Sequence, residues 1–226
     1  MLSPDLSSSL APEPLTLGVT LHINGTASFR VWAPHAASVF LRLKEGYKEV
    51  QLNRDHDNFD MWSLRLAPGA LSKGAAYKVL ICTHDGQKLE RRDPYAHQTE
   101  YSSEWCFVDD PSAFPWSPHI LRPFEENIIY EMHVGSFTPV GTLAAAMEKL
   151  EYIQQLGFTQ VQLMPLTEHS DAWGYNPRQL LSLHGGFGTP DDLRRFVDRA
   201  HQLKMGVIVD VVLHHGAVEV RRSIQA

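Results

Sequence analysis

The sequence predicts two parts of different fold class, a small antiparallel β-sandwich followed by a parallel α/β arrangement. Residues 17–110 carry short β-rich runs separated by turn residues, with no long helical pattern, which is typical of a sandwich. A stretch rich in proline and aromatic residues at 111–126 then marks a boundary. From residue 127 onward, apolar runs alternate with amphipathic helical patterns, and that alternation predicts parallel strands.

Five β-rich runs make up the predicted sandwich. Dipeptides typical of tight turns, such as Asn24-Gly25 and Asp85-Gly86, separate some of them. Ahead of the runs, residues 1–16 are rich in serine and proline without periodicity, which predicts a loose leader. The runs are Ala27–Trp32, Ser38–Lys44, Lys48–Leu52, Met61–Leu66 and Ala76–Thr83.

In the second part, hydrophobic periodicity predicts three strands and two helices. Thr142 can cap the first helix, and Gly157 suits its left-handed exit. Thr189 before Pro190, with Asp192 completing a variant capping box, specifies the start of the second helix. The predicted strands are Ile128–Val134, Thr159–Leu166 and Gly206–Leu213, and the helices are Leu143–Leu156 and Asp191–Leu203.

A carboxylate inside the third predicted strand is the strongest functional signal. Asp210 lies within the apolar run Val207–Leu213, and burying a carboxylate is costly unless it is paired or hydrogen-bonded. Either a structural salt bridge or a function can explain such a residue. His215 can face the same site only if the strand ends or bends near His214, as barrel strands do at their carboxyl ends, where active sites lie.

Four segments, in one order, resemble the α-amylase superfamily, glycoside hydrolase family 13. DVVLHH at 210–215 is similar to the D-x-V-x-N-H signature of the third barrel strand, with His214 in place of the usual asparagine. IYEMHVGSFTPVGTL at 129–143 resembles the first-strand segment of branching and debranching members. GFTQVQLMPLTEH at 157–169 resembles their second strand, and WGYNP at 173–177 resembles the segment that follows it.

The predicted sandwich resembles the carbohydrate-binding module that precedes the barrel in branching enzymes and isoamylases. The resemblance lies in FRVWAPHAASVFLRL at 29–43 and DPYA at 93–96. Trp32 has two possible roles, a glycan platform or a core residue. Its alternating strand position beside Val31 favours the core. Together the similarities span about residues 17–216 and imply an immunoglobulin-like β-sandwich at 17–110, a linker at 111–126, and at 127–226 an incomplete (β/α)8 TIM barrel with its first three strands only.

The resemblance also implies which residues bind sugar. In the family, the residues that match Asp210 and His215 hydrogen-bond the sugar, and the tyrosine that matches Tyr175 stacks against a glucose ring. An aromatic face suits the C–H face of a sugar, while carboxylates and imidazoles suit its hydroxyls. We therefore expect Trp173, Tyr175, Asp210 and His215 to bind an α-glucan, with ordinary core packing as the alternative for the two aromatic residues.

The pair EH at 168–169 followed by WGY favours a glycogen or starch branching enzyme. Family members use one carboxylate as nucleophile and a second as proton donor, and by resemblance these belong to the fourth and fifth strands. We therefore expect no catalytic residue and no activity in this chain, with Glu168 and Asp210 a poor substitute pair. The alternatives are a fragment of an isoamylase or trehalohydrolase, and a non-catalytic glycan-binding or regulatory protein.

Composition narrows the classes of partner and location. The formal net charge is -6 and no basic stripe is present, which argues against nucleic acid as a partner. No segment approaches the ~20 apolar residues of a membrane helix, and the first residues lack the pattern of a signal peptide. We expect a cytoplasmic protein, with a plastid location as the alternative.

Cysteine and histidine usage predicts neither a disulfide scaffold nor a metal centre. Cys82 and Cys106 are expected to be free, buried thiols. His169, His214 and His215 lack the spacing of a zinc site. His214 also replaces the asparagine that holds calcium in some family members, and imidazole is a poor ligand for a hard cation. We expect no metal and no cofactor.

Overall fold

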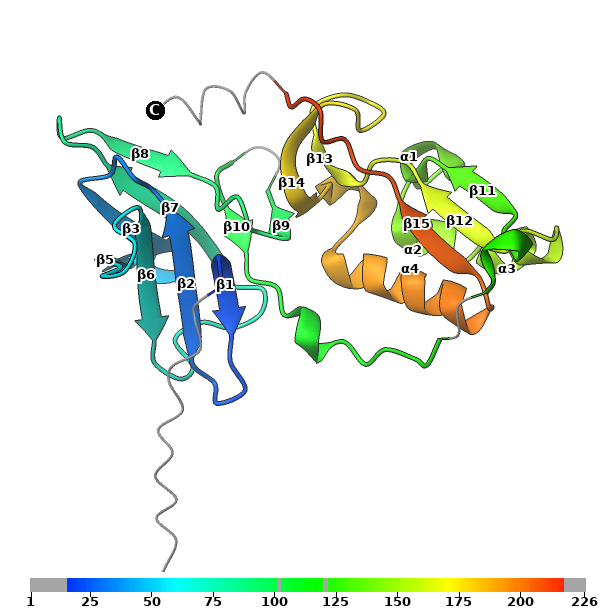
Figure 1. Ribbon diagram of the computed structural model, residues 1–226, viewed down its shortest axis with the longest axis horizontal. Helices are drawn as coiled ribbons and strands as arrows, with labels where there is room; N and C mark the ends of the chain where they lie inside the picture. Colours follow the sequence, from blue (N-terminus) through cyan, green and yellow to red (C-terminus); the bar gives the residue numbers. More distant parts are fainter. Residues whose placement is uncertain (1–15, 101–102, 120–121, 218–226) are drawn as a thin grey trace, which may run out of the picture.

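The computed structural model describes residues 16–100, 103–119 and 122–217. Figure 1 shows two parts side by side, which we call the sandwich part (residues 16–110) and the α/β part (residues 128–217). The predicted leader, apart from its last residue, lies outside the described residues. Within the described ranges, no helix is long and apolar enough to cross a membrane.

Two sheets make up the sandwich part, and each of the five predicted runs is a strand whose ends lie within one residue of the prediction. The first sheet has the order β1 (Gly18–Leu21), β2 (Ala27–Trp32), β6 (Met61–Leu66), β5 (Asn53–Arg54). The second contains β4 (Glu49–Gln51), β3 (Ser38–Leu43), β7 (Ala76–Cys82), β10 (Cys106–Phe107) and β9 (Gln98–Thr99), with β8 (Lys88–Arg91) also on β7.

Side chains from both sheets fill the core between them. Trp62 belongs to this core, where its indole N–H donates to the carbonyl oxygen of Ala33 at 2.9 Å. The prediction that Trp32 is a core residue is wrong, because its side chain is 60% exposed. Successive side chains of a strand point to opposite faces, so buried Val31 turns its neighbour Trp32 toward solvent.

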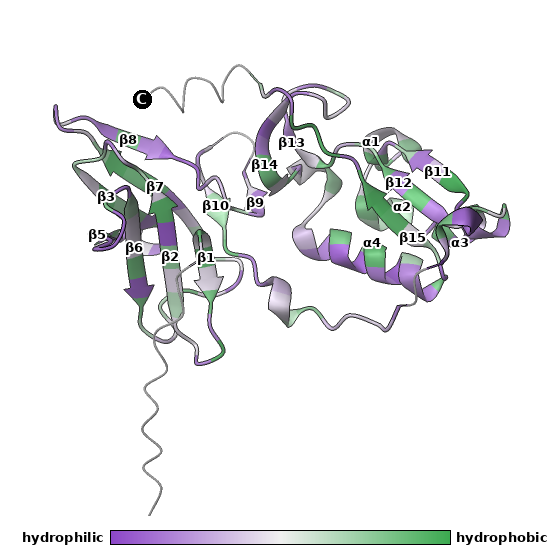
Figure 2. Ribbon diagram, in the orientation of Figure 1, coloured by the Kyte–Doolittle hydropathy of each residue, from purple (hydrophilic) through white to green (hydrophobic). Residues whose placement is uncertain are grey.

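Three parallel strands form the sheet of the α/β part. β11 (Ile129–Met132), β12 (Gln160–Leu163) and β15 (Gly206–Val209) pair in the order β11-β12-β15. Helix α4 (Pro190–Gln202) packs on this sheet, and Figure 2 shows its hydrophobic residues as bands between hydrophilic ones. A short helix, α1 (Val134–Phe137), follows β11.

The helix predicted at 143–156 is divided in two. It consists of α2 (Leu143–Met147) and α3 (Leu150–Gln155). Lys149 has φ −98° and ψ −3°, and its N–H donates to the carbonyl oxygen of Ala146 at 3.0 Å. This bond spans three residues instead of four, so the regular helical pattern is interrupted there.

The helix caps match their predictions. The Thr142 hydroxyl caps α2, and Thr189 with Asp192 forms the expected capping box of α4. Gly157 has the expected positive φ, 97°. Leu156, the last residue of the predicted helix, is exposed, whereas Leu150 and Ile153 of α3 are buried. The reason is that α3 ends at Gln155, so Leu156 lies beyond its last helical residue.

The third strand of this sheet is shorter than its apolar sequence predicts. β15 ends at Val209, so Asp210 lies directly after the strand instead of inside it. Hydrophobic side chains around this end are exposed, including Ile208, Val211 and Leu213. Among the described residues, β15 is also the outermost strand of the sheet, which leaves an apolar edge.

A hairpin that the sequence did not predict joins the two parts. β13 (Thr167–His169) and β14 (Pro177–Leu183) pair with each other, and β14 continues the second sandwich sheet by pairing with β9. The N–H of Leu183 donates to the carbonyl oxygen of His97 at 3.0 Å. Gln179 reaches the backbone carbonyl of Asp93 with its side-chain amide at 2.6 Å. The hairpin therefore belongs to both parts.

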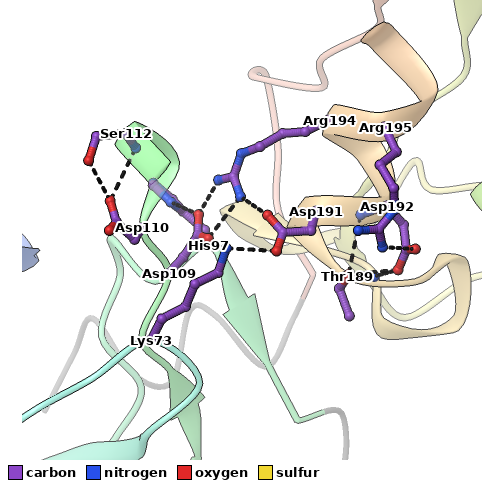
Figure 3. Close-up of polar contacts among 10 residues, drawn as sticks. All are labelled: Lys73, His97, Asp109, Asp110, Ser112, Thr189, Asp191, Asp192, Arg194 and Arg195. Carbon is purple, nitrogen blue, oxygen red and sulfur yellow. Dashed lines mark hydrogen bonds and ion pairs between the residues drawn. The ribbon is translucent and has the colours of Figure 1, made fainter. Parts of the chain in front are cut away.

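A charged cluster, drawn in Figure 3, joins the sandwich part to α4. The Arg194 guanidinium binds both carboxylate oxygens of Asp109 and also donates to Asp191 at 2.6 Å. His97 contacts Asp109 at 2.9 Å, and Lys73 reaches Asp191 at 2.7 Å. The pair at the centre is buried, since its two side chains are 11% and 6% exposed. This arrangement fixes α4 against the sandwich part.

The segment expected to be a linker lies along α4. It contains short 3-10 turns at Pro111–Ala113 and Phe124–Glu126. The backbone N–H of Ser117 donates to the Asp198 carboxylate at 2.7 Å. The rings of His119 and His201 stack with centroids 3.8 Å apart. This segment therefore contributes to the contact between the two parts.

Candidate functional site

The carboxyl ends of β11, β12 and β15 meet at one edge of the parallel sheet. His133 follows β11 directly, and Asp210 follows β15 directly. The chain after β12 enters the β13–β14 hairpin, whose connecting loop carries Trp173 and Tyr175. In parallel α/β folds, ligands bind at this end of the strands, so the predicted site belongs at this edge of the sheet.

The loop that carries the two aromatic residues is held by one carboxylate. Asp171 accepts hydrogen bonds from the backbone N–H groups of Gly174 at 3.1 Å, Tyr175 at 3.3 Å and Asn176 at 3.3 Å. Burial alone raises the pKa of Asp171, but these three donors outweigh it and the pKa is lowered. An ionised carboxylate therefore fixes the loop at neutral pH.

Gly174 is needed at the tip of this loop. Its φ is +89°, and a Cβ atom there would lie 2.6 Å from the carbonyl oxygen of Pro165. Both the left-handed backbone and the close approach exclude an ordinary side chain. The tight turn leaves Trp173 53% exposed and Tyr175 41% exposed, so neither is a core residue.

Imidazole groups flank both aromatic residues. The His133 ring lies 4.9 Å from the ring of Trp173, centroid to centroid. Nε2 of His215 lies 2.6 Å from the carbonyl oxygen of Tyr175. The structure thus brings three of the four predicted residues, Trp173, Tyr175 and His215, to one loop.

Asp210 lies at the same edge without the buried setting that the sequence predicted. It is half-buried, and its backbone N–H donates to the carbonyl oxygen of Leu163 at 3.0 Å. Among the described residues, no ion pair is formed by its side chain. The structural salt bridge is therefore not found there. The sequence required the strand to end or bend near His214 if His215 was to face the same site as Asp210. β15 ends earlier, at Val209, and His215 reaches the loop of Tyr175.

Glu168 is committed to a different contact. Its side chain is fully buried and lies 3.3 Å from Nδ1 of His184, and it accepts the N–H of Gly185 at 3.3 Å. Burial raises the pKa of Glu168, but His184 and the other donors outweigh it, and the pKa is lowered. An ionised carboxylate that is already hydrogen-bonded cannot serve as a proton donor. Glu168 and Asp210 are therefore a still poorer substitute for the two catalytic carboxylates of the family.

An aromatic cluster beneath the loop was not singled out in the sequence. The rings of His169 and His184 stack at 4.0 Å, and both pack against Phe187. The His133 ring lies 6.0 Å from the Phe187 ring, centroid to centroid. Burial lowers the pKa of His133 and of His169, so these imidazoles are neutral at pH 7. Periodicity could not identify them, because they come from separate segments.

The described residues contain no group of three histidine, cysteine or acidic side chains arranged to hold a metal. His214 and His215 are adjacent rings at 4.3 Å. Both cysteines are free, as predicted, with Cys106 buried and Cys82 half-buried.

Comparison with protein families supports the resemblance found in the sequence. Residues 16–96 match carbohydrate-binding module 48, described as the isoamylase N-terminal domain. Residues 92–225 match the alpha amylase catalytic domain, so this match extends beyond residue 216, where the recognised motifs ended.

Curated relatives with two different activities are similar to the chain. A 1,4-alpha-glucan branching enzyme GlgB of Corynebacterium jeikeium is 34% identical over 210 residues, 85% of this chain and 29% of the relative. A malto-oligosyltrehalose trehalohydrolase of Rhizobium sp. is 33% identical over 202 residues, 85% of this chain and 33% of the relative. The chain therefore spans about a third of the length of these relatives.

Solved structures of related proteins share the fold. An alpha-amylase-type protein from Salmonella typhimurium has a TM-score of 0.79 and 31% identity, covering 91% of this chain and 34% of that chain. A pullulanase from Anoxybacillus, solved with maltotriose, has a TM-score of 0.71 and 26% identity, covering 89% and 34%. The chain belongs to the alpha-amylase family of glycoside hydrolase family 13, with a carbohydrate-binding module 48 ahead of its catalytic-domain portion.

Proposed function

We propose that the described residues form the glucan-binding portion of an enzyme that transfers or cleaves α-glucan chains, of the branching-enzyme type. The observation that carries this proposal is the loop that presents Trp173 and Tyr175 beside His133 and His215. Exposed aromatic faces next to imidazoles suit the alternating C–H and hydroxyl faces of glucose. Asp210, at the same sheet edge and without an ion pair among the described residues, is proposed as an acceptor for sugar hydroxyls.

The fold of the α/β part belongs to the same proposal. Strands β11, β12 and β15 are proposed as the first three strands of a (β/α)8 barrel, whose sites lie at the carboxyl ends of the strands. The apolar edge along Val209 and Val211 supports this, because it suits a further strand. By resemblance, the cleaving carboxylates belong to strands that follow in the barrel order.

Binding without cleavage is the expected behaviour of the 226-residue chain. A retaining pair needs two carboxyl groups ~5 Å apart, one of them protonated, and Glu168 is ionised and bound to His184. An iodine-stain assay on amylose should therefore show no change with the purified chain. A change in the stain that tracks protein concentration would contradict this part of the proposal.

Titration with maltotriose, followed by tryptophan fluorescence or NMR, tests the site itself. Tyr175→Ala should weaken maltotriose binding by about tenfold, the effect of losing roughly 1.4 kcal/mol of ring stacking. Tyr175→Phe should retain binding, since the ring is kept. Tyr152→Ala, an equally drastic change at an exposed position of α3, is the matched control. Equal affinity of the Tyr175→Ala and Tyr152→Ala variants would show that the loop is not a sugar site.

A trehalohydrolase type is the second candidate, because relatives of that type are as similar to the chain as the branching enzymes are. Affinity for maltoheptaose and for a maltooligosaccharide that ends in trehalose should separate the two. Preference for the trehalose-ended chain supports the second candidate. Equal or weaker binding of that chain supports the branching type.

A further inference from the structure

Two consecutive residues of β13 are buried, against the alternation of a regular strand. Successive side chains of a strand face opposite sides of the sheet, yet Glu168 and His169 are 0% and 3% exposed. The pairing of β13 with β14 shifts its register on both sides of Glu168. Irregular pairing of this kind re-aims side chains and is over-represented next to active sites. The backbone of β13 therefore allows both side chains to turn inward.

Both side chains meet His184, which follows β14 on the other arm of the hairpin. The Glu168 carboxylate lies 3.3 Å from Nδ1 of His184, and the rings of His169 and His184 stack with centroids 4.0 Å apart. An ionised carboxylate can only accept a hydrogen bond, so the nitrogen of His184 that faces it carries a proton. His184 is thus held on two sides by residues of the opposite strand. We call Glu168, His169 and His184 the hairpin clasp.

The chain after His184 leaves room for its ring. A Cβ atom on Gly186 would lie 2.9 Å from Nε2 of His184, whereas a Cβ atom on Gly185 would have its nearest contact at 3.9 Å. Neither glycine has a left-handed backbone. The absence of a side chain at Gly186 therefore serves the close approach of the imidazole. The N–H of Gly185 donates to Glu168 at 3.3 Å, so the same turn also supports the carboxylate.

A continuous set of aromatic rings leads from the hairpin clasp to the loop that carries Trp173. The Phe187 ring lies 4.9 Å from the His184 ring and 6.0 Å from the His133 ring, centroid to centroid. The His133 ring in turn lies 4.9 Å from the ring of Trp173, and its Nδ1 lies 2.9 Å from the hydroxyl oxygen of Ser136. Because Trp173 is half exposed, its orientation depends on the rings that pack against its other side. A displacement of His184 can therefore reach Trp173 through packed contacts.

We propose that Glu168 and His184 are positioning residues, whose contact across the hairpin sets the orientation of Trp173 without contacting the sugar. A site is held precisely when the residues that support it are themselves locked by packing and hydrogen bonds. The proposal gives a purpose to a carboxylate that is costly to bury and that cannot act as a proton donor. It rests on the proposed function only in treating Trp173 as a sugar platform.

NMR signals of the indole N–H groups test the proposal on the 226-residue chain without any sugar. The Trp173 signal is identified by its loss in Trp173→Phe, and the other four of the five tryptophans serve as internal references. Glu168→Leu should shift the Trp173 signal, whereas Glu168→Gln should leave it in place, because an amide oxygen still accepts from Gly185 and His184. Gly186→Ala should also shift it, since the added methyl group displaces the His184 ring, and Gly185→Ala is the matched control.

The same variants are then titrated with maltotriose, because a misplaced platform should bind sugar less tightly. Glu168→Leu and Gly186→Ala should weaken the affinity by about three- to tenfold. Glu168→Gln and Gly185→Ala should retain it. Arg194→Met controls for loss of stability, since it breaks a buried ion pair outside the hairpin clasp.

The signal of Trp173 separates this inference from the proposed function. A shift in Glu168→Leu and Gly186→Ala that is absent from their matched variants and from Arg194→Met supports the inference, even if the unaltered chain binds no maltotriose and the proposed function fails. An unchanged signal in Gly186→Ala overturns it, even if Tyr175→Ala loses maltotriose and the proposed function stands.

Two other results also overturn the inference. An equal shift in Arg194→Met would show that Trp173 responds to any loss of stability. Full maltotriose affinity in Gly186→Ala, in a chain that loses it in Tyr175→Ala, would show that the hairpin clasp does not position the platform. If Glu168→Leu does not fold, the two glycine variants decide the question alone.

Discussion

Replacing Arg194 by methionine is expected to destabilise the chain far more than the same replacement one position later. The side chains of Arg194 and Asp109 are 11% and 6% exposed, whereas Arg195 is 53% exposed in its pair with Asp192. Removing one partner of a buried ion pair leaves an uncompensated charge and costs about 3–5 kcal/mol. An exposed pair contributes only about 0–1 kcal/mol.

The remaining contacts place the expected cost at the lower end of this range. His97 still lies 2.9 Å from Asp109 in the variant, so we expect a loss of about 3 kcal/mol for Arg194→Met. For a chain of this length, each kcal/mol shifts the melting temperature by about 2–4 °C. Circular dichroism at pH 7 should therefore show a fall of about 6–12 °C for Arg194→Met and at most about 4 °C for Arg195→Met.

The same pair determines how stability changes in acid. Burial raises the pKa of Asp109, but hydrogen bonds from His97 and Arg194 and the charge of Arg194 outweigh it, and the pKa lies well below the ordinary carboxyl value. A carboxyl group with a lowered folded-state pKa stabilises the fold above its unfolded pKa of about 3.9 and loses that effect as pH falls further. In Arg194→Met, the melting temperature should therefore fall less steeply as the pH drops below about 4; this low-pH part of the stability curve is called the acid limb. Equal melting temperatures for the two methionine variants, with an unchanged acid limb, would refute the reasoning.

Three further changes test other features by urea unfolding. Thr189→Ala removes the cap of α4 and should cost about 0.5–2 kcal/mol, while Thr189→Ser should cost almost nothing; equal values contradict the cap. Gly174→Ala should lower the free energy of unfolding more than Gly86→Ala does. Both glycines have a φ of +85° to +89°, where a strained backbone costs about 1–3 kcal/mol, but only at Gly174 would a Cβ lie against Pro165. Equal losses contradict the steric argument. Burial raises the pKa of Asp93 to about 6, so its contribution to stability falls as pH rises through about 6, and Asp93→Asn should flatten that slope; an unchanged slope contradicts the assignment.

Local features of the chain could be predicted because neighbouring residues determine them. The start of α4 depends on Thr189, Pro190 and Asp192, which lie within one turn, and the structure has the full capping box. The sandwich strands likewise depended on alternation and turn dipeptides. The prediction for Trp32 was wrong because an alternating pattern shows only that two neighbouring side chains face opposite sides of the sheet. It does not show which of the two sides faces the core.

Contacts between distant segments could not be predicted in the same way. His97 and Leu183 are bonded through their backbones, yet nothing in either segment identifies the other as its partner. The contact between Glu168 and His184 is of the same kind. Asp210 was expected inside a strand because its neighbours are apolar, and the early end of β15 depends on the surrounding fold, which the local sequence does not contain.

These distant contacts give the sandwich part a role in the proposed sugar site of the α/β part. The loop with Trp173 is connected to β14, and β14 is bonded to β9 of the sandwich part. Gln179 of β14 also bonds the backbone carbonyl of Asp93 at 2.6 Å. A strand paired on both sides is harder to displace than an edge strand, because its backbone groups have partners in each direction. The orientation of the aromatic loop therefore depends on the sandwich part, and a cut at residue 110 would remove one side of its support.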